Sequence, residues 1–292
     1  MKELLLVFVV CMAACNESRS DPRASGKEAT LDRLRRGCTA KSGADCREVG
    51  RRYQNGEEVP RSETEAVRYY ELGCDAGDAA SCHASGQAYL LGFGVVKDVD
   101  RAVQLLTKAC DAGDPDGCFK LGGIQAGGPF GPTIDGATGF RFFVKTCDLG
   151  LPAGCYSAGH AAEFGRHGGP GDSQLATTLY RKGCGVSDEA PLPATLTSFG
   201  QASACWRLGL SGAREDKTRR DGGEKLLHMV RDYFSRQCDA GDHISCFSLG
   251  VIYSTGEGAV VDMSRARTLF ERACDLKNPA GCEQADRMRQ RE

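Results

Sequence analysis

Fourteen of the sixteen cysteines fall into seven ordered pairs, and this series constrains the fold more than any other feature of the sequence. Six pairs enclose seven residues each, and the seventh contains an insertion: Cys38/Cys46, Cys74/Cys82, Cys110/Cys118, Cys147/Cys155, Cys238/Cys246, Cys274/Cys282 and, with the insertion, Cys184/Cys205. An even number of regularly spaced cysteines indicates a disulfide framework. Zinc ligands are usually spaced two to four residues apart, and the chain has only five histidines.

The segments between the pairs form an internal repeat. Each repeat begins near the second cysteine of a pair, carries a glycine four residues later and returns to the next cysteine, as from Cys82 through Gly86 to Cys110. Six repeats begin near residues 45, 81, 117, 154, 204 and 245, and half-repeats at 28–44 and 281–292 are expected to cap them. A unit of this size cannot bury its apolar face alone, so the repeats must stack on one another.

Both arms of a repeat have the spacing of an amphipathic helix. In the first arm Cys46, Gly50 and Tyr53 lie on one helical face. In the return arm two apolar residues, such as Tyr69 and Tyr70, stand four and five positions before the cysteine and are predicted to be core. A glycine inside a helix costs about 1 kcal/mol against alanine, so its recurrence predicts the close approach of a neighbouring helix backbone.

Counting does not determine which cysteines bond to each other. The first cysteine of each pair ends one helix and the second begins the next, across a tight turn such as residues 111–114. Antiparallel helices joined by a short turn can bring these two positions within reach of a disulfide. Bonding within each of the seven pairs is the simplest solution, and it would join every repeat to its neighbour.

The sequence resembles the cysteine-rich Sel1-like repeats of the Helicobacter cysteine-rich protein family. The resemblance rests on residues 245–253 (SCFSLGVIY) and 108–111 (KACD), and it extends over about residues 28–292. It implies an all-α fold, a right-handed α/α superhelical solenoid akin to tetratricopeptide solenoids, with each cysteine pair bridged. It also implies that the first helices line the concave surface. The residues after the second cysteines would then form a candidate groove, unless they pack between repeats instead: Arg47, His83, Phe119, Tyr156, Trp206 and Phe247.

The first residues predict export. The apolar run 4–10 follows Lys2 and is too short to span a bilayer, which takes about 20 helical residues. The end of this run, residues 12–15 (MAAC), resembles a bacterial lipobox, which predicts a signal peptide over 1–14 and a lipid on Cys15. A plain signal peptide cleaved near Ala14 is the alternative. The polar residues 15–27 are expected to form a flexible tether before the solenoid at 28–292.

The repeat that contains Cys205 departs from the pattern. Residues 185–204 hold an insertion inside the Cys184/Cys205 pair, and they are followed by an expected short first helix over 205–209 and a charged loop over 212–223. Insertions in solenoids usually map to loops, often on the binding face. Drift in a tolerant surface loop is the alternative interpretation.

The sequence offers little chemistry. The net charge is −2 with both signs interspersed, which argues against a basic groove for nucleic acid. No HExxH, GxSxG or GxxxxGK[ST] motif occurs, so no catalytic, cofactor or metal residue is predicted. The leading hypothesis is a monomeric scaffold that binds an unknown protein or peptide and touches the membrane only through its lipid. It would lie in the cell envelope, in the periplasm or at the outer membrane, or be secreted if Cys15 is not lipidated.

Two alternatives remain open. The resembled family implies β-lactamase-like or penicillin-binding activity, although no Ser-x-x-Lys motif occurs and Lys217-Thr218 is followed by arginine instead of glycine. The other alternative is binding to a cell-wall polymer.

Overall fold

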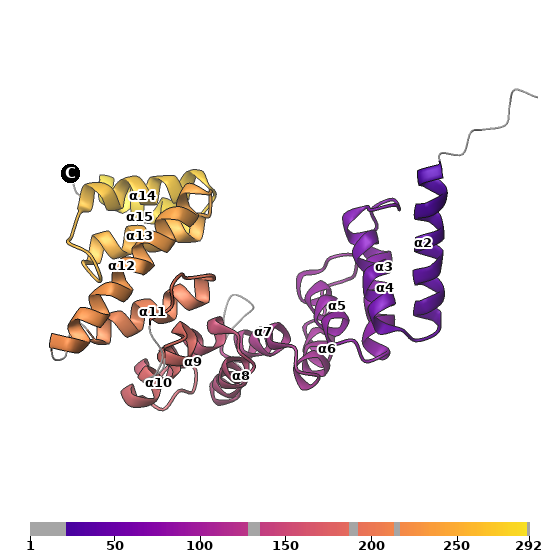
Figure 1. Cartoon of the computed structure of the whole chain (residues 1–292), viewed down its shortest axis with the longest axis horizontal. Coiled ribbons are helices and arrows are strands. Elements are labelled where there is room, and N and C mark those ends of the chain that lie inside the picture. Colours follow the sequence, from indigo (N-terminus) through magenta and orange to yellow (C-terminus); the bar gives the residue numbers. More distant parts are fainter. Residues whose placement is uncertain (1–21, 128–134, 187–191, 213–216, 291–292) are drawn as a thin grey trace, which may run out of the picture. The chain divides into compact units, whose positions relative to one another are not determined.

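The computed structural model describes residues 22–127, 135–186, 192–212 and 217–290. Within these residues the chain forms fourteen α-helices and no β-strand (Figure 1). The predicted all-α class is therefore confirmed. The chain divides into two compact units, unit 1 over Met1–Ala112 and unit 2 over Gly113–Glu292.

Unit 1 is a stack of antiparallel helices in which each helix packs against the next along the chain (Figure 1). A single helix, α2, precedes two helix pairs, and each pair is one repeat. The helices are α2 (Pro22–Thr39), α3 (Gly43–Asn55), α4 (Glu63–Asp75), α5 (Ala79–Leu91) and α6 (Val99–Asp111).

Unit 2 continues the same pattern through four helix pairs and ends on a single helix. Its pairs are α7 (Pro115–Gln125) with α8 (Gly136–Asp148), α9 (Pro152–Phe164) with α10 (Ser173–Cys184), α11 (Phe199–Gly212) with α12 (Lys217–Asp239) and α13 (His243–Thr255) with α14 (Met263–Asp275), followed by α15 (Pro279–Arg289).

Local sequence signals begin and end these helices. The side chains of Asp98 and Asp262 accept hydrogen bonds from the backbone N–H groups of Arg101 and Arg265, so these two aspartates are N-caps of the return helices. At the other end of a first helix the chain turns through a left-handed residue, such as Gly92 with a φ of 79°. Each repeat therefore carries its own start and stop signals.

The first helix begins at Pro22, earlier than the half-repeat expected at 28–44. Proline is favoured in the first turn of a helix because its fixed φ suits the helix and its missing N–H costs nothing there. Residues 22–27, assigned above to a tether, are thus helical. The predicted signal peptide and Cys15 lie outside the described residues. No helix in the described ranges is long and apolar enough to cross a membrane.

Disulfides join consecutive helix pairs. Cys110 and Cys118 are each disulfide-bonded. In the other six bridges the S–S distance is 1.97 to 2.08 Å and the two Cα atoms are 4.4 to 4.7 Å apart: Cys38–Cys46, Cys74–Cys82, Cys147–Cys155, Cys184–Cys205, Cys238–Cys246 and Cys274–Cys282. Fourteen bonded cysteines indicate an oxidising environment for the folded chain.

The recurring glycine packs against a side chain, and this corrects the expectation of a neighbouring backbone. A Cβ added to any of the six glycines would lie 2.6 to 2.9 Å from the nearest side-chain atom of the return helix. Backbone atoms are farther, as at Gly50, where the Ala66 carbonyl oxygen would be 3.1 Å away. The pairs are Gly50/Tyr70, Gly86/Leu106, Gly122/Phe143, Gly159/Tyr180, Gly209/Leu227 and Gly250/Phe270. The glycine is thus a notch for a large side chain.

The fifth repeat corrects a second expectation. The charged loop predicted over 212–223 is largely helical, because α12 begins at Lys217 and α11 continues to Gly212. As a result Gly209 faces Leu227, whereas Phe234, which precedes Cys238 by four residues, packs on Phe199. Leu227 and Phe234 are seven residues apart, which is about two helical turns and leaves both on one face. The extra turns lengthen the return helix without rotating its apolar face.

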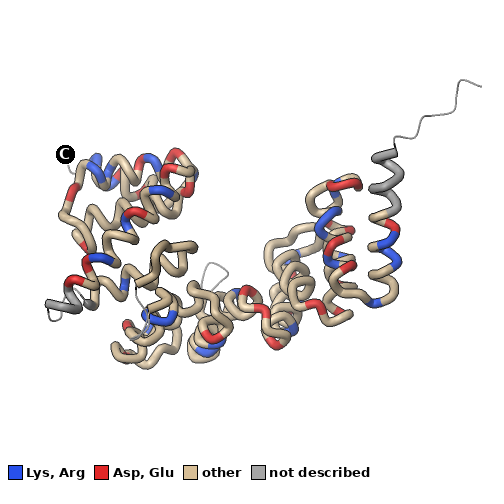
Figure 2. Tube along the Cα trace, viewed as in Figure 1, with Lys and Arg blue, Asp and Glu red and all other residues tan. Residues whose placement is uncertain are grey.

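Ion pairs link successive return helices on the surface. The aspartate after the first cysteine of a pair contacts a basic residue two positions before the next such cysteine. The pairs are Asp75–Lys108 at 3.4 Å, Asp148–Lys182 at 2.6 Å and Asp239–Arg272 at 2.9 Å. All six side chains are exposed, so these pairs contribute little to stability. Acidic and basic residues are interspersed in both units (Figure 2).

Candidate functional site

Three hollows open at equivalent places in the repeats. The α4–α5 hollow has a volume of about 280 Å³, the α10–α11 hollow about 440 Å³ and the α14–α15 hollow about 640 Å³. Each hollow lies between a return helix and the first helix of the next repeat, and the preceding first helix closes one side. The stacking of helix pairs therefore generates the same kind of depression in both units.

The same offsets from the cysteines line each hollow. One lining residue lies eight positions after the cysteine of the first helix, a second lies four before the cysteine of the return helix, and two more lie two and five after the next cysteine. In the α4–α5 hollow these are Gln54, Tyr70, Ala84 and Gln87; in the α10–α11 hollow Glu163, Tyr180, Arg207 and Leu210; in the α14–α15 hollow Ser254, Phe270, Gln284 and Arg287.

The ring in each hollow is held by the glycine notch. Tyr70, Tyr180 and Phe270 are only 6%, 3% and 2% exposed. Each ring fits against the missing side chain of a glycine on the preceding helix. The tyrosine hydroxyls reach the residue eight positions after the cysteine: Tyr70 donates to Gln54 Oε1 at 2.6 Å and Tyr180 to Glu163 Oε2 at 2.8 Å. Packing against the glycine thus fixes the position of the ring. The other lining residues differ between repeats and determine the polarity and charge of each hollow.

The α10–α11 hollow contains a half-buried ion pair. Arg207 donates to Glu163 through Nε, 3.2 Å from Oε2, and through Nη2 to Oε1. The side chains are 17% and 28% exposed, and such two-pronged contacts are among the stronger ion pairs of proteins. The Arg207 guanidinium also lies 5.2 Å from the ring centre of Phe164. The guanidinium is therefore fixed in orientation by a carboxylate and an aromatic ring.

Titratable groups around this pair are shifted by their surroundings. Burial, together with the hydrogen bond to Glu163, raises the pKa of Tyr180 above its usual value. Burial, aided by the Arg207 guanidinium, lowers the pKa of His160. Burial alone would lower the pKa of Arg207, but the hydrogen bond to Glu163 raises it overall. At neutral pH Tyr180 is therefore a neutral donor and Arg207 is charged.

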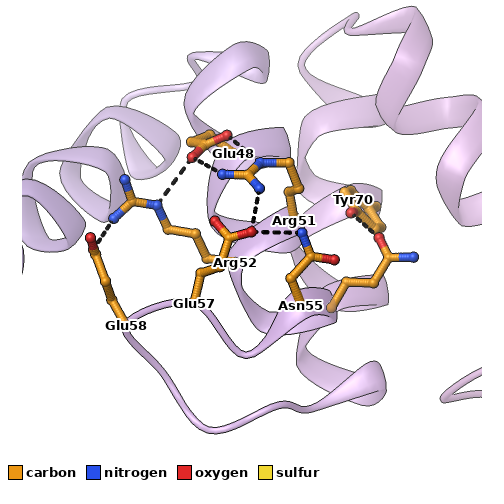
Figure 3. A network of polar contacts seen from close by, with 8 residues as sticks. Glu48, Arg51, Arg52, Asn55, Glu57, Glu58 and Tyr70 are labelled. Atoms are coloured by element: carbon orange, nitrogen blue, oxygen red, sulfur yellow. Dashed lines mark hydrogen bonds and ion pairs between the residues drawn. The ribbon is translucent and has the colours of Figure 1, made fainter.

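A surface network in unit 1 links α3 to the hairpin that follows it (Figure 3). Arg51 contacts Glu48 through two nitrogens at 2.9 Å each and Glu57 at 2.7 Å. Arg52 contacts Glu48 at 3.1 Å and also Glu58. The two arginines therefore tie the hairpin carboxylates to the last turns of α3.

Replacing Glu48 by glutamine is expected to remove part of the acid sensitivity of the fold. The hydrogen bond from Arg51, followed in effect by that from Arg52, lowers the pKa of Glu48 from 4.5 to about 2. A carboxyl whose pKa is lower in the folded state stabilises the fold above its unfolded pKa, and this stabilisation is lost as the pH falls from about 4.5 to 2. Urea unfolding should show E48Q less stable than the natural protein at pH 7, by about 1 kcal/mol or less because the side chain is 34% exposed.

The gap between the two proteins should close by pH 2. Glu224, which is exposed on α12, provides the control, and E224Q should cost less stability at pH 7 than E48Q. A constant gap between pH 7 and pH 2 for E48Q would contradict the assignment.

Of the six predicted groove residues, three pack against the return helix of their own repeat. Phe119, Tyr156 and Phe247 lie 5.7, 6.3 and 5.5 Å, between ring centres, from Phe143, Tyr180 and Phe270 of their return helices. Trp206 donates through Nε1 to the Glu257 carbonyl oxygen at 3.0 Å, Arg47 pairs with Asp78 at 2.8 Å, and His83 is half-buried. None of the six lines one of the three hollows. A groove built on these positions stays a prediction.

The sequence did not predict the lining residues, because only positions that recur carry a periodic signal. Offsets two, five and eight vary from repeat to repeat, as Gln54, Glu163 and Ser254 do, and therefore carry no periodic signal of their own. Their common sequence separation from the cysteines could have identified them as equivalent surface positions of successive repeats.

These features define a class: a disulfide-linked α-helical repeat protein with depressions between its repeats. The Sel1 repeat family model matches residues 45–78, 79–114, 152–184 and 243–278. The chain thus contains Sel1 repeats, and the predicted repeat fold is confirmed. Sel1 repeats are typical of scaffolds for protein–protein interaction.

Known proteins similar to this chain include solved structures and curated relatives. The Sel1 repeat protein from Oxalobacter formigenes has a TM-score of 0.58 with 22% identity over 82% of this chain and 89% of its own. Helicobacter pylori cysteine rich protein B is 31% identical over 37% of this chain and 77% of its own, with a TM-score of 0.31. Cytochrome c oxidase assembly factor 7 of Xenopus tropicalis is 30% identical over 125 residues, which are 42% of this chain and 48% of that protein. The chain thus spans about half the length of this curated relative.

Proposed function

We propose that this protein is an exported scaffold that binds a peptide segment of a partner protein through its inter-repeat hollows. The carrying observation is that one hollow recurs at three equivalent steps with a different lining at each. A constant shape with variable chemistry suits recognition of different kinds of peptide side chain, one in each hollow. The name of the Xenopus relative, an assembly factor, is in keeping with protein binding.

Export and anchoring belong to the same proposal. The disulfides support an oxidising compartment, and the apolar run before Cys15 supports a signal peptide with a lipid on that cysteine. The scaffold would then be tethered in a bacterial cell envelope. Metabolic labelling with an alkyne fatty acid should mark the natural chain and leave C15S unlabelled, and equal labelling of both would reject the anchor at Cys15.

Filling a hollow with a large side chain is expected to weaken the binding of peptides that insert a side chain into it. Peptides would first be selected on the oxidised protein from a displayed random library. Ala84 is half-buried and lines the α4–α5 hollow, so tryptophan there should occupy most of its volume of about 280 Å³. A84W should weaken peptides bound at this hollow by tenfold or more, which corresponds to about 1.4 kcal/mol of binding free energy. Fluorescence anisotropy of labelled peptides would measure the change.

A matched variant controls for changes in the fold. Ala80 lies on the same helix, is exposed and is not among the residues that line the hollow, so A80W should leave binding intact. L210W and Q284W fill the other two hollows in the same way. The proposal fails if no peptide is enriched on the oxidised protein, or if the enriched peptides bind equally to all three filled variants.

A further inference from the structure

We infer that the α10–α11 hollow takes a lysine or arginine side chain of the bound peptide. This inference rests on the proposed function, because it names the chemistry that one of the three hollows would recognise. It is argued from the charges that line the hollow, from the contacts that hold its rim and from its apolar wall.

The charged residues that line this hollow include one more carboxylate than cations. The charged residues of the lining are Glu163, Arg207 and Glu257. Glu163 and Arg207 neutralise each other through two contacts. Within the described ranges no basic side chain forms an ion pair with Glu257, which is half-buried. A cation beside this carboxylate gains a favourable Coulomb interaction, so the lining favours a ligand with one positive charge.

The rim that carries Glu257 is fixed by the fifth repeat. Glu257 belongs to the hairpin between α13 and α14, and its carbonyl oxygen accepts the hydrogen bond from Trp206 Nε1. Arg231 donates to the carbonyl oxygen of Gly258, and a Cβ on Gly258 would lie 3.0 Å from the Leu227 side chain. Both Arg231 and Leu227 lie on the long helix α12. The return helix of the fifth repeat thus supports the hairpin at the edge of this hollow through Leu227 and Arg231.

The wall of the hollow suits the alkyl stem of a basic side chain. Phe164 is 47% exposed, and Ala176, Tyr180 and Leu210 add apolar surface beside it. Lysine and arginine bury their methylene stems along such surfaces while the charged head stays near a polar rim. The ring of Phe164 already attracts Arg207 at 5.2 Å and Arg166 at 5.8 Å. Arg166 is exposed and is not a lining residue, so it leaves the hollow open.

The equivalent hollows have different charge. In the α4–α5 hollow the charged lining residues Arg61 and Glu63 pair with each other at 2.9 Å, and the hairpin contributes Phe93. In the α14–α15 hollow Arg267 and Arg287 outnumber Glu271. Of these three hollows, only the α10–α11 hollow therefore has an excess of negative charge.

Pentapeptides with one variable side chain test the inference. The probes are acetylated and amidated Ala-Ala-X-Ala-Ala, where X is arginine, lysine, citrulline or glutamate; citrulline keeps the shape of arginine without its charge. Trp206 is the single tryptophan of the chain and contacts the rim, so its fluorescence reports binding to the full-length oxidised protein. The arginine and lysine probes should bind about fivefold more tightly than the citrulline probe.

The E257Q variant should abolish this preference for a cation, whereas E271Q, which changes a carboxylate in the α14–α15 hollow, should preserve it. Equal dissociation constants for the arginine and citrulline probes, a preference for the glutamate probe, absence of any response, or a preference that survives E257Q would each overturn the inference. Library peptides that lose affinity in A84W or Q284W would, in those cases, still support the proposed function, so the two failures are distinguishable.

Discussion

Replacing Gly94 by alanine is expected to lower the free energy of unfolding by about 3 kcal/mol. Gly94 has a φ of 68°, which costs an L-residue about 1 kcal/mol or more. An added Cβ would also lie 2.4 Å from the Glu63 carbonyl carbon and 2.7 Å from the Thr64 nitrogen, both backbone atoms at the start of α4. Overpacking of this kind typically costs 1 to 3 kcal/mol. Urea unfolding followed by circular dichroism, with the disulfides intact, would measure the loss.

The variant G77A separates the cost of the positive φ from the cost of overpacking. Gly77 has a similar φ of 87°, but an added Cβ would meet nothing within 4 Å. Only the conformational cost should remain, so G77A should lose about 1 kcal/mol. Equal losses in G94A and G77A would show that the hairpin of the second repeat does not depend on its close contact with α4.

Removing the Cys184–Cys205 bridge is expected to cost about 3.3 kcal/mol. In the loop-entropy model the stabilisation grows with the length of the closed loop, and this bridge has a sequence separation of 21 residues, against 8 for the Cys238–Cys246 bridge. The double variant C184A/C205A should therefore lose more than C238A/C246A, for which the model gives about 2.5 kcal/mol. All four cysteines are almost completely buried, so the change to alanine disturbs packing to a similar extent in both variants.

Urea unfolding of both double variants at pH 7 would compare the losses. A smaller loss for C184A/C205A than for C238A/C246A would mean that the inserted residues already restrict the unfolded chain, or that local packing outweighs loop entropy at this bridge.

The positions of the repeats and their core were predictable because their signals are local. The cysteine offsets, the N-cap aspartates and the apolar spacing of the return helices lie within one or two helical turns of each other. Tyr70, Tyr180 and Phe270 are buried as their spacing predicted. The charged loop over 212–223 was mispredicted because its charged residues suggested a loop, although helix α12 already begins at Lys217.

The candidate site could be predicted only in part. Sequence spacing identified aromatic residues beside the cysteines, and those residues pack against their own return helices. The ion pair between Glu163 and Arg207 joins residues 44 positions apart on different repeats. Neither residue recurs, so no periodic pattern pointed to the pair.

The sequence by itself determined the α-helical repeats, the identity of their buried positions and the cysteine pairs, because each of these depends on contacts between neighbouring segments. Tertiary structure alone decided what the glycine notch receives, which side chains share a hollow, and that the hairpin of Glu257 reaches the α10–α11 hollow. These outcomes depend on how far one helix pair is displaced against the next, and that displacement is set by the shapes of side chains far apart in the sequence.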